Sequence, residues 1–467
     1  MEVLTNMSSK FPKLRLGMLI LLLVITSILF ITQFTACIYV YDELPAPVGD
    51  LDYKVNADGE TCTITGMGSY KSKTLDIPDE IDGLKVTAIA DLAFKGANIE
   101  KVNFSSELKS IGLGAFDECR SLVSVGFPKG NEHITTIKDY TFRNCVKLIK
   151  ISFPENLISI GREAFFGCER LVGVELPDTV TTISEGGFRQ CKRLENIHIP
   201  LNIKEIKKNA FLDCYNLKSI NLPEGLLSIG DNAFKGCWIN LKEVVIPNTV
   251  TSIGEYAFSY CESLRKITLP QSLKAIPVGL FNGCIELEEI SIPNSVESIG
   301  IASFVACFSI KEITIPASVK SVGEGAFLAC FSLENIFVDE ANTAWCSVNG
   351  VLYHKDMKTL HSYPSGKVEK NFAIPEGVNV IYNYAFAYNP NLEMIEIPNS
   401  VTNIGKYIIL DVAYSGVSSE HSKLHTIKYD GTIANWKSVT KSPYWDVDAP
   451  EFTLYCTDGT ETFERTE

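Results

Sequence analysis

Short stretches of alternating apolar and polar residues recur along most of the chain. The unit 287–307 shows the pattern, and its apolar positions are Leu287, Ile290, Ile292, Val296 and Ile299. The first three alternate with polar residues, which predicts a short strand with one buried face. Pro293 has no amide hydrogen and ends this strand, and Gly300 supplies a turn after a second apolar element. Each unit therefore predicts two short extended segments joined by turns.

The units repeat with a constant period. One cysteine column consists of Cys119, Cys145, Cys168, Cys191, Cys214, Cys237, Cys261, Cys284, Cys307 and Cys330, and seven of its nine gaps are 23 residues. Phenylalanine occurs three residues before each of these cysteines, from Phe116 to Phe327. Proline follows the same period from Pro154 to Pro316. A shared period in three residue types indicates a solenoid, in which each unit contacts only its neighbours.

Each column has a physical interpretation in such a stack. One unit cannot bury its apolar side alone, whereas stacked units bury it between strands about 4.8 Å apart. The Leu and Ile columns then build the core, and the Phe column stacks from unit to unit. The cysteines, replaced by Asn389 in a late unit and by Ala97 in the first, are expected to be buried against backbone carbonyls.

The pattern resembles the BspA-like family of leucine-rich repeats, which occur on surface proteins of bacteria and some parasitic protists. Two near-consensus pieces are residues 264–273, Leu-x-x-Ile-x-Leu-Pro-x-x-Leu, and residues 253–261, Ile-Gly-x-x-Ala-Phe-x-x-Cys. The resemblance covers roughly residues 60–460 and includes a closing element with Trp436 and Trp445. It implies a surface-exposed interaction scaffold. The expected fold is a leucine-rich-repeat solenoid, a β-rich right-handed coil of about 12–13 repeats of 23 residues, with an N-terminal transmembrane or signal helix.

The N-terminus carries a membrane signal. Lys10, Lys13 and Arg15 precede an apolar run over residues 16–31 that resumes over 34–41, and acidic residues follow. This charge order predicts export of everything C-terminal to it. An uncleaved anchor is favoured, because the run is long enough to span a bilayer. A lipoprotein, lipidated at Cys37, and a cleaved signal peptide are the alternatives.

The pattern also predicts an organisation along the chain. The predicted segments are a cytoplasmic tip and signal segment (1–41), a stalk (42–60), a cap with the first repeat (61–98), regular repeats (99–330), an irregular repeat (331–371), further repeats (372–428) and a C-terminal cap (429–467). Within the irregular repeat, Asn349-Gly350 predicts a β-hairpin over 346–353 that returns through 359–363. We expect this hairpin to project from the stack and to present Trp345 and Tyr353 as a candidate contact site.

Charge and motifs disfavour several classes of function. With 56 acidic against 42 basic residues the net charge is −14, which disfavours binding to nucleic acid. The column cysteines are too far apart in sequence for a metal site with local ligand spacing, and the sequence predicts no metal, cofactor or catalytic residues. Buried thiols are favoured over disulfides between successive units, because alternate pairing would break the shared role that an even period indicates.

The remaining prediction is a binding surface. Strand residues between the core positions should face outward on the concave sheet, and the candidates are Lys150, Ser152, Glu175, Asn196, His198, Asn221, Lys266, Thr268, Ser291 and Thr314. These side chains favour an extracellular or host protein as the partner, in a non-catalytic adhesion scaffold. A passive envelope spacer is the alternative, and a carbohydrate-active protein is the least favoured interpretation.

Overall fold

The computed structural model describes residues 51–410 and 422–464. The predicted membrane segment and Cys37 lie outside the described residues, as does most of the predicted stalk. The chain divides into two units after Val48, and all of the described residues belong to the second, Gly49–Glu467. Among these residues, no helix is long and apolar enough to cross a membrane.

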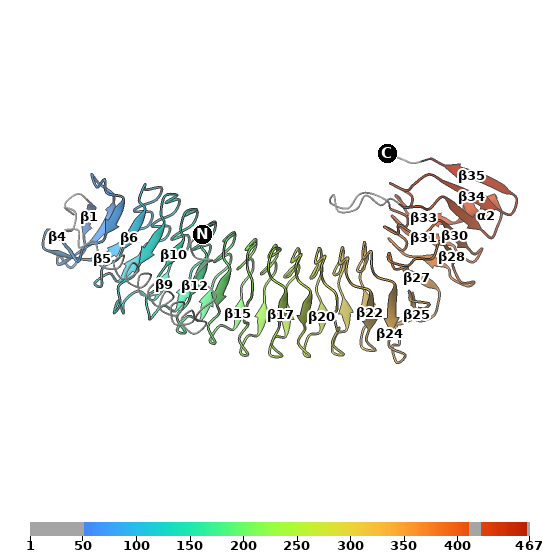
Figure 1. The fold of residues 1–467 in the computed structure, drawn as a ribbon, viewed down its shortest axis with the longest axis horizontal. Coiled ribbons are helices and arrows are strands. Elements are labelled where there is room, and N and C mark those ends of the chain that lie inside the picture. Colours follow the sequence, from blue (N-terminus) through green and yellow to red (C-terminus); the bar gives the residue numbers. More distant parts are fainter. Residues whose placement is uncertain (1–50, 411–421, 465–467) are drawn as a thin grey trace, which may run out of the picture. The chain divides into compact units, whose positions relative to one another are not determined.

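The second unit is a β-solenoid of about 17 turns with the leucine-rich-repeat fold, and its coils follow one another in chain order (Figure 1). Most coils contribute one short strand to a face ladder, and the coils of Ser219 and Glu289 contribute an isolated bridge instead. The face ladder consists of β3 (Thr74–Asp76), β6 (Lys101–Asn103), β8 (Ser124–Gly126), β10 (Lys150–Ile151), β12 (Gly173–Glu175), β14 (Asn196–His198), β17 (Glu243–Val245), β19 (Lys266–Thr268), β22 (Glu312–Ile315), β24 (Asn335–Val338), β28 (Asn371–Ala373), β30 (Met394–Ile397), β32 (Thr426–Tyr429) and β34 (Phe452–Cys456). Where neighbouring members pair they do so in parallel, as Gly173 with Asn196 and Glu175 with His198.

A second strand of each coil joins a lateral ladder. Its members are the end of β5 (Leu84–Ile89), β7 (Ser110–Ile111), β9 (Thr136–Ile137), β11 (Ser159–Ile160), β13 (Thr182–Ile183), β15 (Glu205–Ile206), β16 (Ser228–Ile229), β18 (Ser252–Ile253), β20 (Ala275–Ile276), β21 (Ser298–Ile299), β23 (Ser321–Val322), β27 (Thr359–Ser362), β29 (Val380–Ile381), β31 (Asn403–Ile404) and β33 (Thr440–Lys441). Both ladders turn one side inward, so the Leu, Ile and Val columns form a continuous buried core.

The phenylalanine column stacks as the period predicts. From Phe94 to Phe327, successive rings lie 5.1–6.5 Å apart between centroids. Phe165, Phe188 and Phe211 are nearly parallel in orientation, with interplanar angles of 3° and 2°. The stacking of these rings on successive coils, on which the solenoid interpretation depends, is confirmed.

Left-handed residues shape the turn that carries each phenylalanine. In the coil of Phe258, Tyr256 and Tyr260 have φ values of 56° and 55°. Their amides donate to the carbonyls of Val278 and Asn282 in the next coil, at 3.0 and 2.7 Å. The alternation of left-handed and right-handed residues directs every second amide along the stack, so the turns are hydrogen-bonded between coils although they are not strands.

The N-terminal cap begins before the predicted boundary at residue 61. β1 (Asp52–Val55) pairs antiparallel with β2 (Thr61–Gly66), and β4 (Glu80–Ile81) pairs antiparallel with β5. The prediction that residues 52–55 belong to a stalk is therefore wrong. These residues are part of the cap sheet, because the first coil needs a partner for its open edge.

At the other end, the stack closes with α2 (Ile433–Ser438) and with β35 (Gly459–Phe463), which pairs antiparallel with β34. Thr432 caps α2, and its hydroxyl accepts a hydrogen bond from the amide of Asn435. Trp436 and Trp445, the tryptophans of the predicted closing element, are both buried and lie 5.8 Å apart between centroids. Aromatic side chains thus seal the core where the coils end.

Candidate functional site

The outward side of the face ladder is polar because each strand alternates. In β14, Ile197 is buried while Asn196 and His198 are exposed. All ten side chains predicted for this surface are exposed. Two of them make local contacts: the Ser152 hydroxyl accepts from the amide of Phe127 at 3.0 Å, and His198 Nε2 lies 3.1 Å from a carboxylate oxygen of Asp178.

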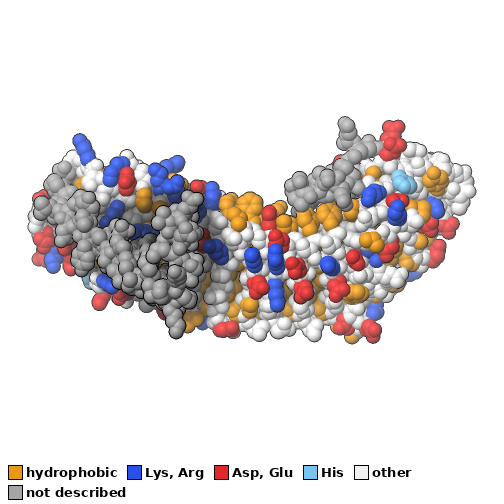
Figure 2. Space-filling model, viewed as in Figure 1, with side chains coloured by type: hydrophobic (Ala, Val, Ile, Leu, Met, Phe, Trp, Pro, Cys, Tyr) orange, Lys and Arg blue, Asp and Glu red, His pale blue; other side chains and the backbone are white. Residues whose placement is uncertain are grey.

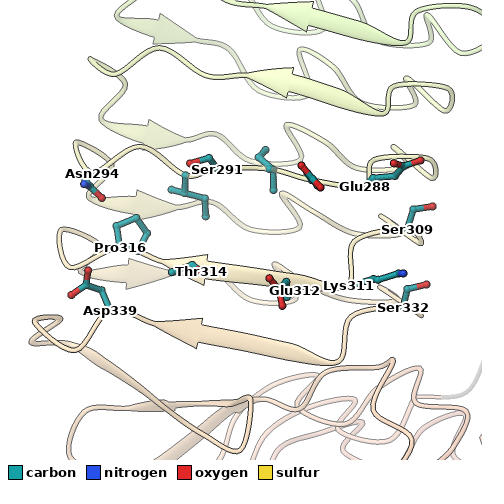
Figure 3. Close-up of a pocket in the computed structure, with 13 residues that line it drawn as sticks. Glu288, Ser291, Asn294, Ser309, Lys311, Glu312, Thr314, Pro316, Ser332 and Asp339 are labelled. Carbon is teal, nitrogen blue, oxygen red and sulfur yellow. The ribbon is translucent and has the colours of Figure 1, made fainter.

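The structure brings only two of the ten together in a hollow. Ser291 and Thr314 line a groove of about 840 Å³ on the face ladder, whereas the other eight are distributed along the same surface outside it. Figure 3 shows the labelled side chains of successive coils directed into this groove, which ends at Pro316 and Asp339 on one side. A second hollow of about 510 Å³ lies further along, at β30, β32 and β34.

The charges of the groove are mainly negative. Glu288, Glu289, Glu312 and Asp339 line it, and Lys311 is its single basic residue. Among residues 51–410 and 422–464, Glu288, Glu289 and Glu312 form no ion pair, although Glu288 interacts electrostatically with Arg265. The carboxylates therefore remain available to a basic group from outside.

An apolar stripe begins on coils that precede the groove and continues beside it, and no part of the predicted binding surface includes this stripe. It consists of the residues that directly follow the column cysteines in five coils, which are Tyr215, Trp238, Ile285, Phe308 and Phe331. All five side chains are at least partly exposed, and Trp238 is 40% exposed. The sequence signal that could have predicted this stripe is the position of its residues directly after each column cysteine. Figure 2 shows hydrophobic side chains along one margin of the stack, next to a band of charged ones.

Within the stripe, aromatic rings contact each other in pairs. Tyr215 and Trp238 lie 4.9 Å apart between centroids in a T-shaped arrangement, and Phe308 and Phe331 lie 5.1 Å apart. Glu262 occupies the equivalent position between Trp238 and Ile285, and its burial raises the pKa of its carboxyl. The apolar surroundings thus disfavour its charged form.

The predicted hairpin is present but does not project from the stack. β25 (Trp345–Val348) and β26 (Val351–His354) pair antiparallel, with Cys346 opposite Tyr353, and β26 continues into β27. Trp345 and Tyr353 are 4% and 1% exposed, so the prediction of a projecting contact site is wrong. The hairpin is held against the stack because β26 pairs with β27, which in turn pairs with β29 in the lateral ladder. The side chains of Trp345 and Tyr353 are therefore buried in the core.

The hairpin also buries a histidine. The His361 ring stacks on Tyr382 at 4.7 Å and meets Trp345 edge-on at 5.0 Å. Desolvation lowers the pKa of His361 to about 3. The ring is therefore neutral at physiological pH and acts as a core side chain.

The column cysteines are buried thiols that donate hydrogen bonds. Each Sγ from Cys119 to Cys330 lies 3.0–3.6 Å from the carbonyl oxygen of the phenylalanine one coil earlier. Desolvation raises the pKa of Cys119, Cys261 and Cys330 to about 12. All described cysteines are free, and no group of His, Cys, Asp or Glu among the described residues has the arrangement of a metal site.

Asn389 takes the place of a column cysteine and makes more hydrogen bonds. Its amide nitrogen donates to the carbonyl of Pro364 at 3.1 Å, and its side-chain oxygen accepts from the amides of Asn391 and Leu392. Asn131 and Asn342 make equivalent bonds in irregular coils, where the period of the columns did not predict them. Side-chain donors to carbonyls of the preceding coil thus tie the stack together.

Comparison with known proteins agrees with this architecture. The protein family described as the BspA type leucine rich repeat region matches this chain over residues 87–136, 135–240, 228–348 and 363–430. A leucine-rich cell surface protein of Faecalibacterium prausnitzii is 26% identical with a TM-score of 0.51, covering 84% of this chain and 96% of that one. A leucine-rich repeat protein of Bacteroides ovatus is 24% identical with a TM-score of 0.48, covering 77% and 95%. No curated protein matches the chain significantly. Because the family matches well over half of its residues, the chain belongs to the BspA-type leucine-rich repeat proteins.

Proposed function

We propose that this protein is a non-catalytic scaffold at the cell surface that binds another protein through its face ladder and takes part in adhesion. The observation that carries the proposal is the groove on the face ladder, where exposed polar side chains of successive coils converge. A rigid, repetitive sheet holds these side chains without an ordering cost on binding. The similarity to a leucine-rich cell surface protein supports the surface location.

The N-terminal segment supports attachment at the membrane, with the bulk of the chain outside the cytoplasm. Its basic residues precede the apolar run and its acidic residues follow it. We propose an uncleaved anchor, with a lipid on Cys37 and cleavage as the alternatives. Mass analysis of the mature N-terminus distinguishes the three, since each leaves a different terminal mass.

The binding proposal is tested with purified protein on beads, by measuring retention of soluble extracellular-matrix and cell-surface proteins. The expected result is saturable retention of a partner, altered by charge reversal at Lys150 and Lys266, which are exposed on the face ladder. Absence of any saturable partner would favour a passive envelope spacer. Retention that ignores both substitutions would place the contact elsewhere on the chain.

A further inference from the structure

The apolar stripe and the groove share three coils, those of Ile285, Phe308 and Phe331, whereas Tyr215 and Trp238 extend the stripe onto coils that precede the groove. Ser309 and Ser332 line the groove, and each directly follows a stripe residue, Phe308 or Phe331. In Figure 3 both serines lie at the same end of the groove as Glu288 and Lys311. The stripe is therefore one wall of a surface whose floor is the face ladder.

Exposure of the apolar stripe residues to water is unfavourable in free energy. Trp238 and its neighbour Ile239 are 40% and 51% exposed, and the other stripe side chains are partly exposed. Aromatic side chains of this kind dominate protein interfaces, because they bury a large area with few rotatable bonds. The stripe is confined to the coils of Tyr215 to Phe331, since the equivalent residues of the two preceding coils are Glu169 and Lys192. Such confinement indicates a local contact surface rather than a property of every coil.

The charge of the floor selects the partner. Four carboxylates, on Glu288, Glu289, Glu312 and Asp339, face a single lysine, Lys311, among the groove residues. Since Glu289 and Glu312 have no ion-pair partner among the described residues, a basic side chain gains their attraction without displacing an existing pair. An acidic or nucleic-acid partner meets repulsion from the same groups.

The length of the surface suits an extended segment. The stripe crosses five coil-to-coil steps from Tyr215 to Phe331, which at about 4.8 Å per step is about 24 Å. An extended chain covers this distance with about seven residues at about 3.4 Å each. We propose that the stripe and the groove together bind an extended, basic segment of a partner protein in which lysine or arginine neighbours large apolar residues. This inference rests on the proposed binding function and adds its site and the chemistry of the partner.

The test uses the purified full-length chain and a fluorescent nine-residue peptide that alternates lysine or arginine with leucine, valine and tyrosine. A matched peptide carries glutamate in place of every basic residue. We expect the basic peptide to bind and the acidic one not to bind. Trp238→Ser should weaken binding about tenfold or more, as loss of an interface aromatic does. Glu312→Lys should weaken it at least about fivefold and reduce its salt dependence.

Control variants keep the test specific. Glu155→Lys makes the same charge change on an exposed residue outside both the face-ladder strands and the groove, and it should leave peptide binding unchanged. Far-ultraviolet circular dichroism and the melting temperature show whether each variant is folded. No binding of the basic peptide, equal binding of both peptides, or equal effects of Glu312→Lys and Glu155→Lys would overturn the inference. If beads still capture a partner saturably, the proposed function survives that failure.

Discussion

Replacing Phe211 by alanine should open the stack locally. Phe211 is fully buried, and its ring stacks on Phe188 at 5.9 Å and on Phe234 at 5.4 Å between centroids. A Phe→Ala change in a core costs about 3–5 kcal/mol, from lost apolar burial and the cavity left behind. At about 1.4 kcal/mol per factor of ten, local opening should become roughly 10²- to 4 × 10³-fold more frequent.

The cysteine column reports this opening directly. Cys214 lies in the altered coil, and Cys237 donates its thiol to the carbonyl of Phe211. Both are buried, so a thiol reagent reaches them only when the coils separate. The assay is alkylation followed by peptide mass spectrometry under native conditions. We expect the labelling of Cys214 and Cys237 to accelerate by the same factor as the opening, and Phe211→Leu to have a smaller effect.

Distant cysteines supply the control, because each coil contacts only its neighbours. Cys119 and Cys330 lie several coils away in either direction and should label at the rate of the unaltered protein. Equal acceleration at all ten cysteines would show that the chain opens as one cooperative body and would refute the nearest-neighbour reasoning. An unchanged rate at Cys214 would refute the energetic role of the ring stack.

The coil interior allows three further tests. Burial raises the pKa of Cys261 to about 12, so the folded thiol stays protonated while the unfolded one ionises near pH 9. The free energy of unfolding should therefore be constant below pH 9 and fall between pH 9 and 12, by up to about 1.4 kcal/mol per pH unit for each such thiol. Urea titrations at pH 8 and 10.5 measure this fall. Asn389→Ala should cost about 2–4 kcal/mol, more than Cys261→Ala, because it leaves the amides of Asn391 and Leu392 without partners and removes one of the two hydrogen bonds to the Pro364 carbonyl, as hydrogen exchange of those amides would show. Ala302→Gly should raise the free energy of unfolding by about 1 kcal/mol, because Ala302 has a φ of 54°. Gly279→Ala should lower the free energy of unfolding, because Gly279 has a φ of 59° and an added Cβ would meet the Tyr256 ring. Melting temperatures that shift in the same direction for both variants would contradict the backbone argument.

The number of turns could not be predicted from the repeat period alone. The regular columns predict about 12–13 repeats, whereas the structure has about 17 turns. The additional turns lie at the ends, where coils such as those of β3 and β34 lack the Phe and Cys columns. They join the stack through backbone pairing and aromatic packing, as Trp445 does against Phe452 at 6.2 Å. Neither interaction requires a repeated residue type.

The sequence by itself determined the coil, because strand alternation, the turn residues and the Phe and Cys columns are all local and recur from unit to unit. It predicted that Phe165, Phe188 and Phe211 stack and that the cysteines meet carbonyls, and both predictions are confirmed. Tertiary packing alone decided that the hairpin of Trp345 lies inside the core, and that the residues after five cysteines line up as an exposed stripe beside a groove. The reason is that burial of a nonrepeating segment, and the hollowing of a sheet, depend on contacts between coils distant in sequence, which no single unit encodes.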